Sequence, residues 1–237
     1  VGGKVSSMMV TKRNGDKEPV SLDKITNRIS VLSTGLSIDP IVVAQKAIPG
    51  LFNEITSAEI DNYLAETAAA LTVEHPDYSY LAARIKANAL HKETPGFIIA
   101  NKNLYEDGLL KEEYYQKILK NAEQIESIID YDRDYHFDYF ALTTLTRAYL
   151  LKFENKIIER PQDLWMRVAL TVSCKVFNYE KVKNTYFALS SGMYTHATPT
   201  LFNSGLKMQQ LSSCFLIGME DDSIEGIFNT IKDCALI

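Results

Sequence analysis

The sequence predicts a mainly helical protein with a small sheet near its start and a strand followed by a helix near its end. Apolar residues recur at α-helical spacing through most of the 237 positions. One short apolar run, residues 211–219, has the length and the polar borders of a buried strand. With 46% apolar and 23% charged residues, the chain can bury a sizeable core.

Roughly the first 95 residues are expected to form one compact unit, a small sheet with about four helices. Asn14-Gly15 predicts a hairpin with a type I′ turn, and Pro19 confines the second arm to a sheet edge. The helices are expected to start at Ser21, at Asp39-Pro40, at the capping box Thr56–Glu59 and at His75–Asp77.

The middle of the chain, to about Gly192, also has helical spacing. The expected helices cover residues 109–129, a segment from Pro161 with Trp165, Val168 and Val172 facing inward, and a segment that ends at Gly192. Between the first two, Glu154-Asn155 indicates a short hairpin.

The last part changes character. Residues 195–205 have the composition of a loop, the apolar run 211–219 follows, and Asp222 or Ser223 can cap a final helix. A strand that leads into a helix is the beginning of an α/β unit, which needs partner strands. No such strands follow, so we expect the chain to be part of a longer protein.

Bulk properties exclude several classes of function. The formal net charge of −5 argues against a nucleic-acid partner, and no apolar stretch approaches the roughly 20 residues that cross a bilayer. The N-terminus lacks the pattern of a signal peptide. The sequence has three cysteines and no CxxC pair, which argues against a disulfide framework and indicates a reducing cytoplasm. Its four histidines are scattered, which argues against a metal site.

Basic residues gather in the first hairpin and the helix after it: Lys12, Arg13, Lys17, Lys24 and Arg28. A helix start beside them offers free N–H groups to a phosphate. The alternative is an ordinary solvated surface. Asp61 could accept hydrogen bonds from a ribose or base, or be a plain helix-surface acid, and Lys92 could hold a phosphate or face the end of its own helix.

Cys214 also has two interpretations. A cysteine in an apolar strand is usually a small buried hydrophobic residue. However, Cys214 lies at the polar end of its run, after a loop with several hydroxyl side chains that could bind a phosphorylated substrate. Cys174 and Cys234 lie within helical patterns and are interpreted as core or incidental residues.

Six stretches carry a more specific signal: VTKRNGDKEPVSLDKITNRI, AETAAALTVEHPDYSYLAARI, IIDYDRDYHFDYF, ERPQDLWMRV, THATPTLFNSG and LSSCFLIGMEDDSIEGIFNTIKDCALI. Through these blocks, which cover nearly the whole chain in order, the sequence resembles the large (catalytic) subunits of eukaryotic-type class I ribonucleoside-diphosphate reductases.

The resemblance implies a domain organisation. Residues 1–8 would be disordered or foreign to the natural protein, and 9–98 would form an ATP-cone, an allosteric domain of a small sheet and a four-helix bundle. Residues 99–205 would be the helical N-terminal part of the catalytic domain. Residues 206–237 would begin a ten-stranded α/β barrel.

The resemblance also implies site residues. ATP or dATP, with Mg²⁺, would contact Lys12, Arg13, Glu18, Pro19, Val20, Ser21, Leu22, Asp23, Lys24, Ser57, Asp61 and Lys92. Cys214 would be one of two redox-active thiols that reduce the ribose 2′ position, and Thr198 and Ser213 would bind substrate. Specificity effectors, which are dNTPs, would bind at Asp222, Ser223 and Ile224.

By the same resemblance, the full protein converts ribonucleoside diphosphates to deoxyribonucleotides for DNA replication by thiyl-radical chemistry. Its partners would be a second large subunit, a small subunit whose metal cofactor supplies the radical, and thioredoxin or glutaredoxin as reductant. The chain departs from the family at four positions. Met208 and Gln209 replace a basic residue and a proline, and Ser57 and Thr198 each exchange one hydroxyl residue for another.

Two alternatives remain open. A nucleotide-sensing repressor with an ATP-cone would carry a zinc ribbon of two CxxC pairs, and this sequence has none. The 237 residues could also act only as a nucleotide-binding or assembly module, because the second thiol and the radical cysteine are expected outside them. We therefore expect no turnover from this polypeptide alone.

Overall fold

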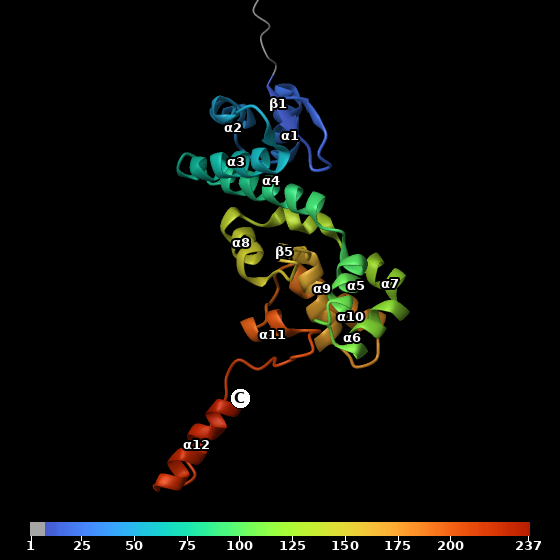
Figure 1. The fold of residues 1–237 in the computed structure, drawn as a ribbon, viewed down its shortest axis with the longest axis vertical. Helices are drawn as coiled ribbons and strands as arrows, with labels where there is room; N and C mark the ends of the chain where they lie inside the picture. The colour runs from blue at the N-terminus through green and yellow to red at the C-terminus, as the bar shows by residue number, and fades with distance from the viewer. Residues whose placement is uncertain (1–7) are drawn as a thin grey trace, which may run out of the picture.

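The computed structural model describes residues 8–237 as two folded units and an extended C-terminal segment (Figure 1). The predicted extension 1–8 therefore falls outside the described residues except for Met8. Helix α4, Asp77–Glu93, runs between the two units. Within residues 8–237 no helix is both long and apolar enough to cross a membrane.

The first unit has the predicted small sheet and four helices. Its three-stranded sheet has the order β2-β1-β3, with β1 antiparallel to β2 and parallel to β3. The caps at Ser21, Asp39 and Thr56 are confirmed, because each side chain accepts a backbone N–H of its helix. The elements are β1 Met9–Thr11, β2 Lys17–Pro19, α1 Leu22–Leu32, α2 Pro40–Ala47, η1 Ile48–Gly50, β3 Ile55–Thr56, α3 Ser57–Ala70, η2 Leu71–Val73 and α4.

The first hairpin exists, but its predicted type I′ turn is wrong. Lys12 N–H donates to the Asp16 carbonyl and Gly15 N–H donates to the Lys12 carbonyl, so three residues form the loop. In such a loop only the last position needs a positive φ, and Gly15 supplies it at 89°. Pro19 lies in the edge strand β2, as predicted.

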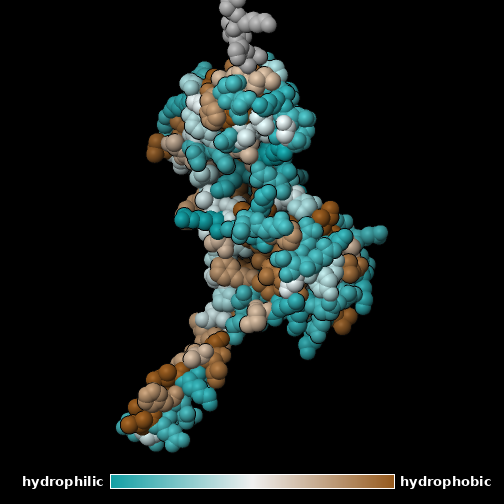
Figure 2. Space-filling view, viewed as in Figure 1, coloured by the Kyte–Doolittle hydropathy of each residue, from teal (hydrophilic) through white to brown (hydrophobic). Residues whose placement is uncertain are grey.

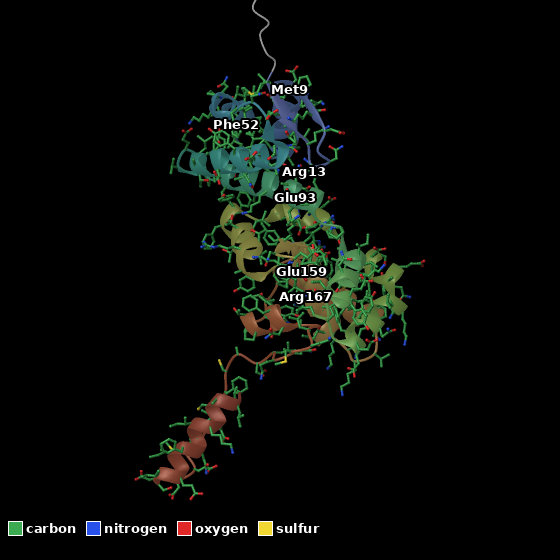
Figure 3. All side chains as sticks on the ribbon, viewed as in Figure 1. Met9, Arg13, Phe52, Glu93, Glu159 and Arg167 are labelled. Atoms are coloured by element: carbon green, nitrogen blue, oxygen red, sulfur yellow. The ribbon has the colours of Figure 1, made fainter. Side chains whose placement is uncertain are left out.

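The second unit is helical and carries the predicted hairpin, with positive φ at Glu154 and Asn155. Inside it, Arg167 Nε donates to Glu159 Oε1 at 2.6 Å, and both side chains are buried (Figure 3). The elements are α5 Phe97–Glu106, α6 Glu112–Lys120, α7 Ala122–Ile128, η3 Tyr131–His136, α8 Tyr139–Thr144, the π-helical turn η4 Leu145–Tyr149, β4 Lys152–Phe153, β5 Lys156–Ile157, α9 Pro161–Val172, α10 Tyr179–Ser190 and α11 Thr198–Asn203.

Three details of the second unit differ from expectation. The helical stretch 109–129 is broken at Asn121, between α6 and α7. Val172, predicted to face inward, is 38% exposed, because it is the last residue of α9 and lies where that helix leaves the core. The expected loop 195–205 contains the short helix α11, with Pro199 in its first turn, where a missing N–H costs nothing.

The predicted buried strand 211–219 is wrong in this structure. Residues 209–221 have no regular secondary structure, and Leu216 is fully exposed. A strand needs a neighbour to receive its hydrogen bonds, and every strand described in residues 8–237 pairs elsewhere. Helix α12, Ile224–Leu236, follows with Ser223 as its cap and an apolar face in the open (Figures 1 and 2). The barrel stays a prediction.

Helix α4 belongs to the cores of both units. Leu81 and Ile85 pack in the core of the first unit, and Leu90 packs in the core of the second. Between them, Ala87 packs against Leu142 of α8. One continuous helix therefore has buried side chains in the cores of both units.

Candidate nucleotide site

A cavity of about 170 Å³ opens in the first unit, where the sheet meets the starts of α1 and α3. Ser21 and Ser57 bring the N-termini of these two helices to the same opening. Helix N-termini present free N–H groups and a positive dipole end, which favour anions. The cavity is lined by Val10, Lys12, Glu18, Val20, Ser21, Lys24, Ile25, Arg28, Ser57, Ile60 and Asp61.

Asp61 is the buried centre of the charges in this site, with a side chain 1% exposed. Arg13 donates to its Oδ2 at 2.8 Å, and Arg28 donates to its Oδ1. Arg13 also donates to Glu93 at 2.9 Å, at the junction of the two units (Figure 3). The Nε of Arg28 is buried without a hydrogen-bond partner within residues 8–237, so a donor remains for a ligand at the cavity.

Two lysines share one carboxylate at the outer wall. Lys12 lies 3.2 Å from Glu18, and Lys24 lies 3.4 Å from the same carboxylate. The hydrogen bond from Lys12 is the main cause that holds the pKa of Glu18 below its usual value. Both lysines are well exposed, so these pairs are weak and can open to a phosphate.

Lys92 lies on the last turn of α4, beside this cluster. Burial, and after it the positive charge of Arg28, lowers its pKa; Arg13 acts in the same direction, and Asp61 partly opposes them. Lys92, Arg13 and Arg28 carry like charges that repel one another, and an anion placed among them reduces this repulsion.

The structure gathers most of the residues that the resemblance implied for this site. Arg13 and Lys92 flank the cavity, whereas Pro19, Leu22 and Asp23 are neighbours in the chain that do not line it. Seven line it directly: Lys12, Glu18, Val20, Ser21, Lys24, Ser57 and Asp61.

Sequence reasoning did not place Arg28 at the site, although it counted Arg28 among the basic residues. Arg28 lies four residues after Lys24 on α1, so both side chains lie on the same face of the helix. That spacing was the available signal. No comparable signal pointed to the apolar lining at Val10, Ile25 and Ile60, because each is also an ordinary core position.

The second predicted site is not assembled in these residues. Cys214 is an exposed free thiol, and its only hydrogen bond within residues 8–237 is a 3.6 Å contact from the Ser213 hydroxyl. Thr198 contacts the Tyr149 hydroxyl at 3.1 Å. Within residues 8–237 no hydrogen bond joins Thr198 to Cys214, although Thr200 and Asn203 of the same helix donate to the carbonyls of Leu211 and Gln210. No group of three or more His, Cys, Asp or Glu side chains in this part of the chain could hold a metal ion.

The third predicted site lies at the start of α12. Ser223 caps the helix by accepting a hydrogen bond from the Gly226 N–H at 3.1 Å. Of the two caps that the sequence allowed, Asp222 and Ser223, the structure therefore has Ser223. Ile224 follows as the first helical residue and is exposed.

Two known families match the first unit and the later part of the second unit. The family described as "ATP cone domain" matches residues 8–93, and the family described as "Ribonucleotide reductase, all-alpha domain" matches residues 135–209. The first match contains the whole nucleotide cavity. The second contains helices α8 to α11.

Curated relatives match nearly the whole chain. A ribonucleoside-diphosphate reductase large subunit of Dictyostelium discoideum is 46% identical over 99% of this chain and 28% of its own length. The large subunit of Arabidopsis thaliana is 45% identical over 97% of this chain and 30% of its own length. Large chain 2 of Saccharomyces cerevisiae is 45% identical over 97% of this chain and 28% of its own length. The chain thus spans about three tenths of the length of these relatives.

Proposed function

This chain belongs to the family of ribonucleoside-diphosphate reductase large subunits, and from that premise we propose that its first unit is an allosteric site for ATP and dATP. The supporting observation is the cavity at which two helix N-termini meet beside Lys12, Lys24 and Arg28. Helix N-termini and clustered cations are suited to a triphosphate. The apolar side chains of the lining offer a surface for the base, and we assign Asp61, which lines the cavity, as the acceptor for a ribose hydroxyl.

Calorimetric titration of the 237-residue chain with ATP and dATP, in the presence of Mg²⁺, tests this proposal. The double variant Lys12→Gln/Lys24→Gln should bind both nucleotides at least 10-fold more weakly, because two phosphate-facing cations are removed. Lys17→Gln is the matched control, since Lys17 lies in the same hairpin but outside the cavity, paired with Glu54. Absence of heat with either nucleotide would disprove the allosteric site.

For the complete protein, we propose reduction of ribonucleoside diphosphates, with Cys214 as one of two reducing thiols. The two thiols give up two electrons and two protons as their sulfurs join in a disulfide, and the ribose 2′ carbon loses its hydroxyl as water. A dithiol protein such as thioredoxin or glutaredoxin then reduces the disulfide. The second thiol and the radical-carrying cysteine would come from outside these residues, with Thr198 and Ser213 holding the substrate.

We further propose a cytoplasmic assembly in which two large subunits pair and a small subunit with a metal cofactor supplies the radical. Helix α12 supports the pairing, because Ile227, Phe228 and Ile231 lie exposed on it. Asp222, Ser223 and Ile224 at its start would bind the dNTP that sets substrate specificity.

A second candidate function is a nucleotide-sensing or assembly module without catalysis. One observation favours it: the nucleotide cavity is complete in this chain, whereas Cys214 has no second thiol nearby within residues 8–237. Formation of deoxyribonucleotide by the purified 237-residue chain, with a small subunit and a dithiol reductant present, would contradict this alternative and our expectation of no turnover.

A further inference from the structure

A second cavity, of about 460 Å³, lies between the two folded units. The first unit contributes Ala58 and Asn62 of α3 and four residues of α4, and the second unit contributes α8, β5 and the π-helical turn η4. Its volume falls within the range of small-molecule sites, and π-turns recur at functional sites. It is lined by Ala58, Asn62, Lys86, Ala89, Leu90, Glu93, Thr143, Thr146, Arg147 and Ile157.

Two cations face this cavity from opposite units. Lys86 of α4 is half-buried, and among the described residues its ammonium contacts the Thr143 hydroxyl, at 3.2 Å, and the Tyr139 ring, whose centroid is 5.5 Å away. Arg147 comes from η4. Within residues 8–237 neither side chain forms a salt bridge. Burial lowers the pKa of Lys86, and the negative charge of Glu66 on α3 opposes this shift only in part.

Glu93 is the one acidic residue among the described residues that line this cavity, and its carboxylate is already paired with Arg13. Arg13 donates to its carboxylate at 2.9 Å from the side of the nucleotide cavity. Lys86 and Arg147 therefore give this interdomain cavity an excess of positive charge. The Asn62 amide and the Thr143 hydroxyl add neutral donors to the lining.

We propose that the interdomain cavity binds a small polyanion of the pyrophosphate class between Lys86 and Arg147. The polyanion could be free or the phosphate tail of a nucleotide. Two cations supplied by different units suit an anion with charged oxygens at both ends, and the volume exceeds what a single phosphate fills. The apolar lining is aliphatic, without an aromatic ring on which a base could stack, so the phosphates are the recognised part.

Occupation of this cavity acts on the nucleotide site through side chains already in contact. A polyanion repels Glu93, Glu93 shares Arg13 with Asp61, and Asp61 lines the nucleotide cavity. The polyanion would also bridge the two units, since its two cations come from different ones. Binding itself does not depend on the proposed allosteric function; only this coupling does.

The test is a titration of pyrophosphate into the 237-residue chain saturated with ATP, with binding measured by calorimetry and by ³¹P NMR. The variant Lys86→Met/Arg147→Gln should bind pyrophosphate at least 10-fold more weakly than the wild type, while Lys232→Gln, which removes an exposed lysine of α12, should bind as the wild type does. Arg147→Gln alone, at an exposed position, should give a partial loss without any risk to folding. Unchanged binding in the double variant, or an equal loss in Lys232→Gln, would overturn the proposal.

The two sources of the anion are separated in the Lys12→Gln/Lys24→Gln background, where the nucleotide cavity is impaired. Tighter binding of pyrophosphate than of ADP identifies a free polyanion, and the reverse order identifies a nucleotide tail. If the wild type binds no ATP but still binds pyrophosphate through Lys86, the allosteric proposal fails and this one stands. If neither pyrophosphate nor ADP binds in this background, the interdomain site is disproved.

Discussion

The nucleotide cavity and the Cys214 segment differ in how much of their surroundings lies within the same folded unit. The cavity is enclosed by a sheet and two helices that share one core, and Asp61 is held there by two arginines. Cys214 lies in the extended segment before α12, with exposed neighbours on both sides. The residues that line the cavity all belong to one folded unit, whereas Cys214 lies in a segment without regular secondary structure.

This difference teaches which function can be tested on this chain. A regulatory site inside one unit keeps its geometry when that unit folds, because its caps, ion pairs and core are internal. The thiol of Cys214 lies in a segment without regular secondary structure, so the described residues do not hold it in the fixed geometry that catalysis requires.

Limited proteolysis should give the largest contrast. Chymotrypsin should cut after Phe215 or Leu216 at least 1,000-fold faster than after Tyr78 or Phe97, because the first pair is exposed and the second pair is buried in folded cores. Mass spectrometry of the early products measures the order of cuts. First cleavage inside residues 22–93 would show that the first unit is not the rigid one.

Asp163 should make the stability of the second unit depend on pH. Burial raises the pKa of Asp163 to about 7, although hydrogen bonds from the Tyr131 hydroxyl, at 2.6 Å, and the Arg160 N–H, at 2.8 Å, oppose the shift. In the unfolded chain the same carboxyl titrates near 3.8. Between these values the unfolded state has lost a proton that the folded state keeps.

The free energy of unfolding should therefore fall as pH rises from 4 to 7, by about 4 kcal/mol at most from this group. Urea unfolding at pH 4.5 and at pH 7 measures the change. Asp163→Asn removes the titrating group, so the free energy of unfolding of this variant should depend less steeply on pH. Parallel curves for the wild type and the variant would contradict the assignment to Asp163.

Alkylation should separate the three cysteines. Cys214 is exposed and should react with iodoacetamide about 10-fold faster than half-buried Cys174, at a rate that ATP does not change. Exposed Cys234 on α12 serves as the internal reference. Peptide mapping measures the rate of alkylation at each cysteine. Protection of Cys214 by ATP would mean that the extended segment folds onto the first unit and is not independent of it.

Local signals in the sequence were sufficient for most of the first unit. Ser21, Asp39 and Thr56 each act on N–H groups two or three residues away, so their roles could be predicted without the rest of the fold. Arg28 could not be assigned in this way, because its partner Asp61 lies 33 residues further along the chain.

The misassigned strand has a related cause. An apolar run such as 211–219 shows a preference for burial, but the partners that would bury it and receive its hydrogen bonds are not encoded in it. The turn at Gly15 shows the same limit on a smaller scale. The Asn-Gly pair correctly indicated a hairpin, whereas the number of residues in the loop depended on how β1 and β2 pair.

The smallest expected effect concerns the choice between ATP and dATP, which differ only in the ribose 2′ hydroxyl. Asp61→Asn keeps the size of the side chain but removes the charge that orients Arg13 and Arg28, and it weakens the acceptor available to the ribose. We expect the ratio of the two affinities to change about 3- to 5-fold toward unity, measured by calorimetry with each nucleotide. Glu93→Gln is the matched control, since Glu93 binds the same Arg13 from outside the nucleotide cavity, and it should leave the ratio unchanged. If the Asp61→Asn variant retains the wild-type ratio, Asp61 only holds the arginines in place, and discrimination must come from the backbone and side chains at the starts of α1 and α3.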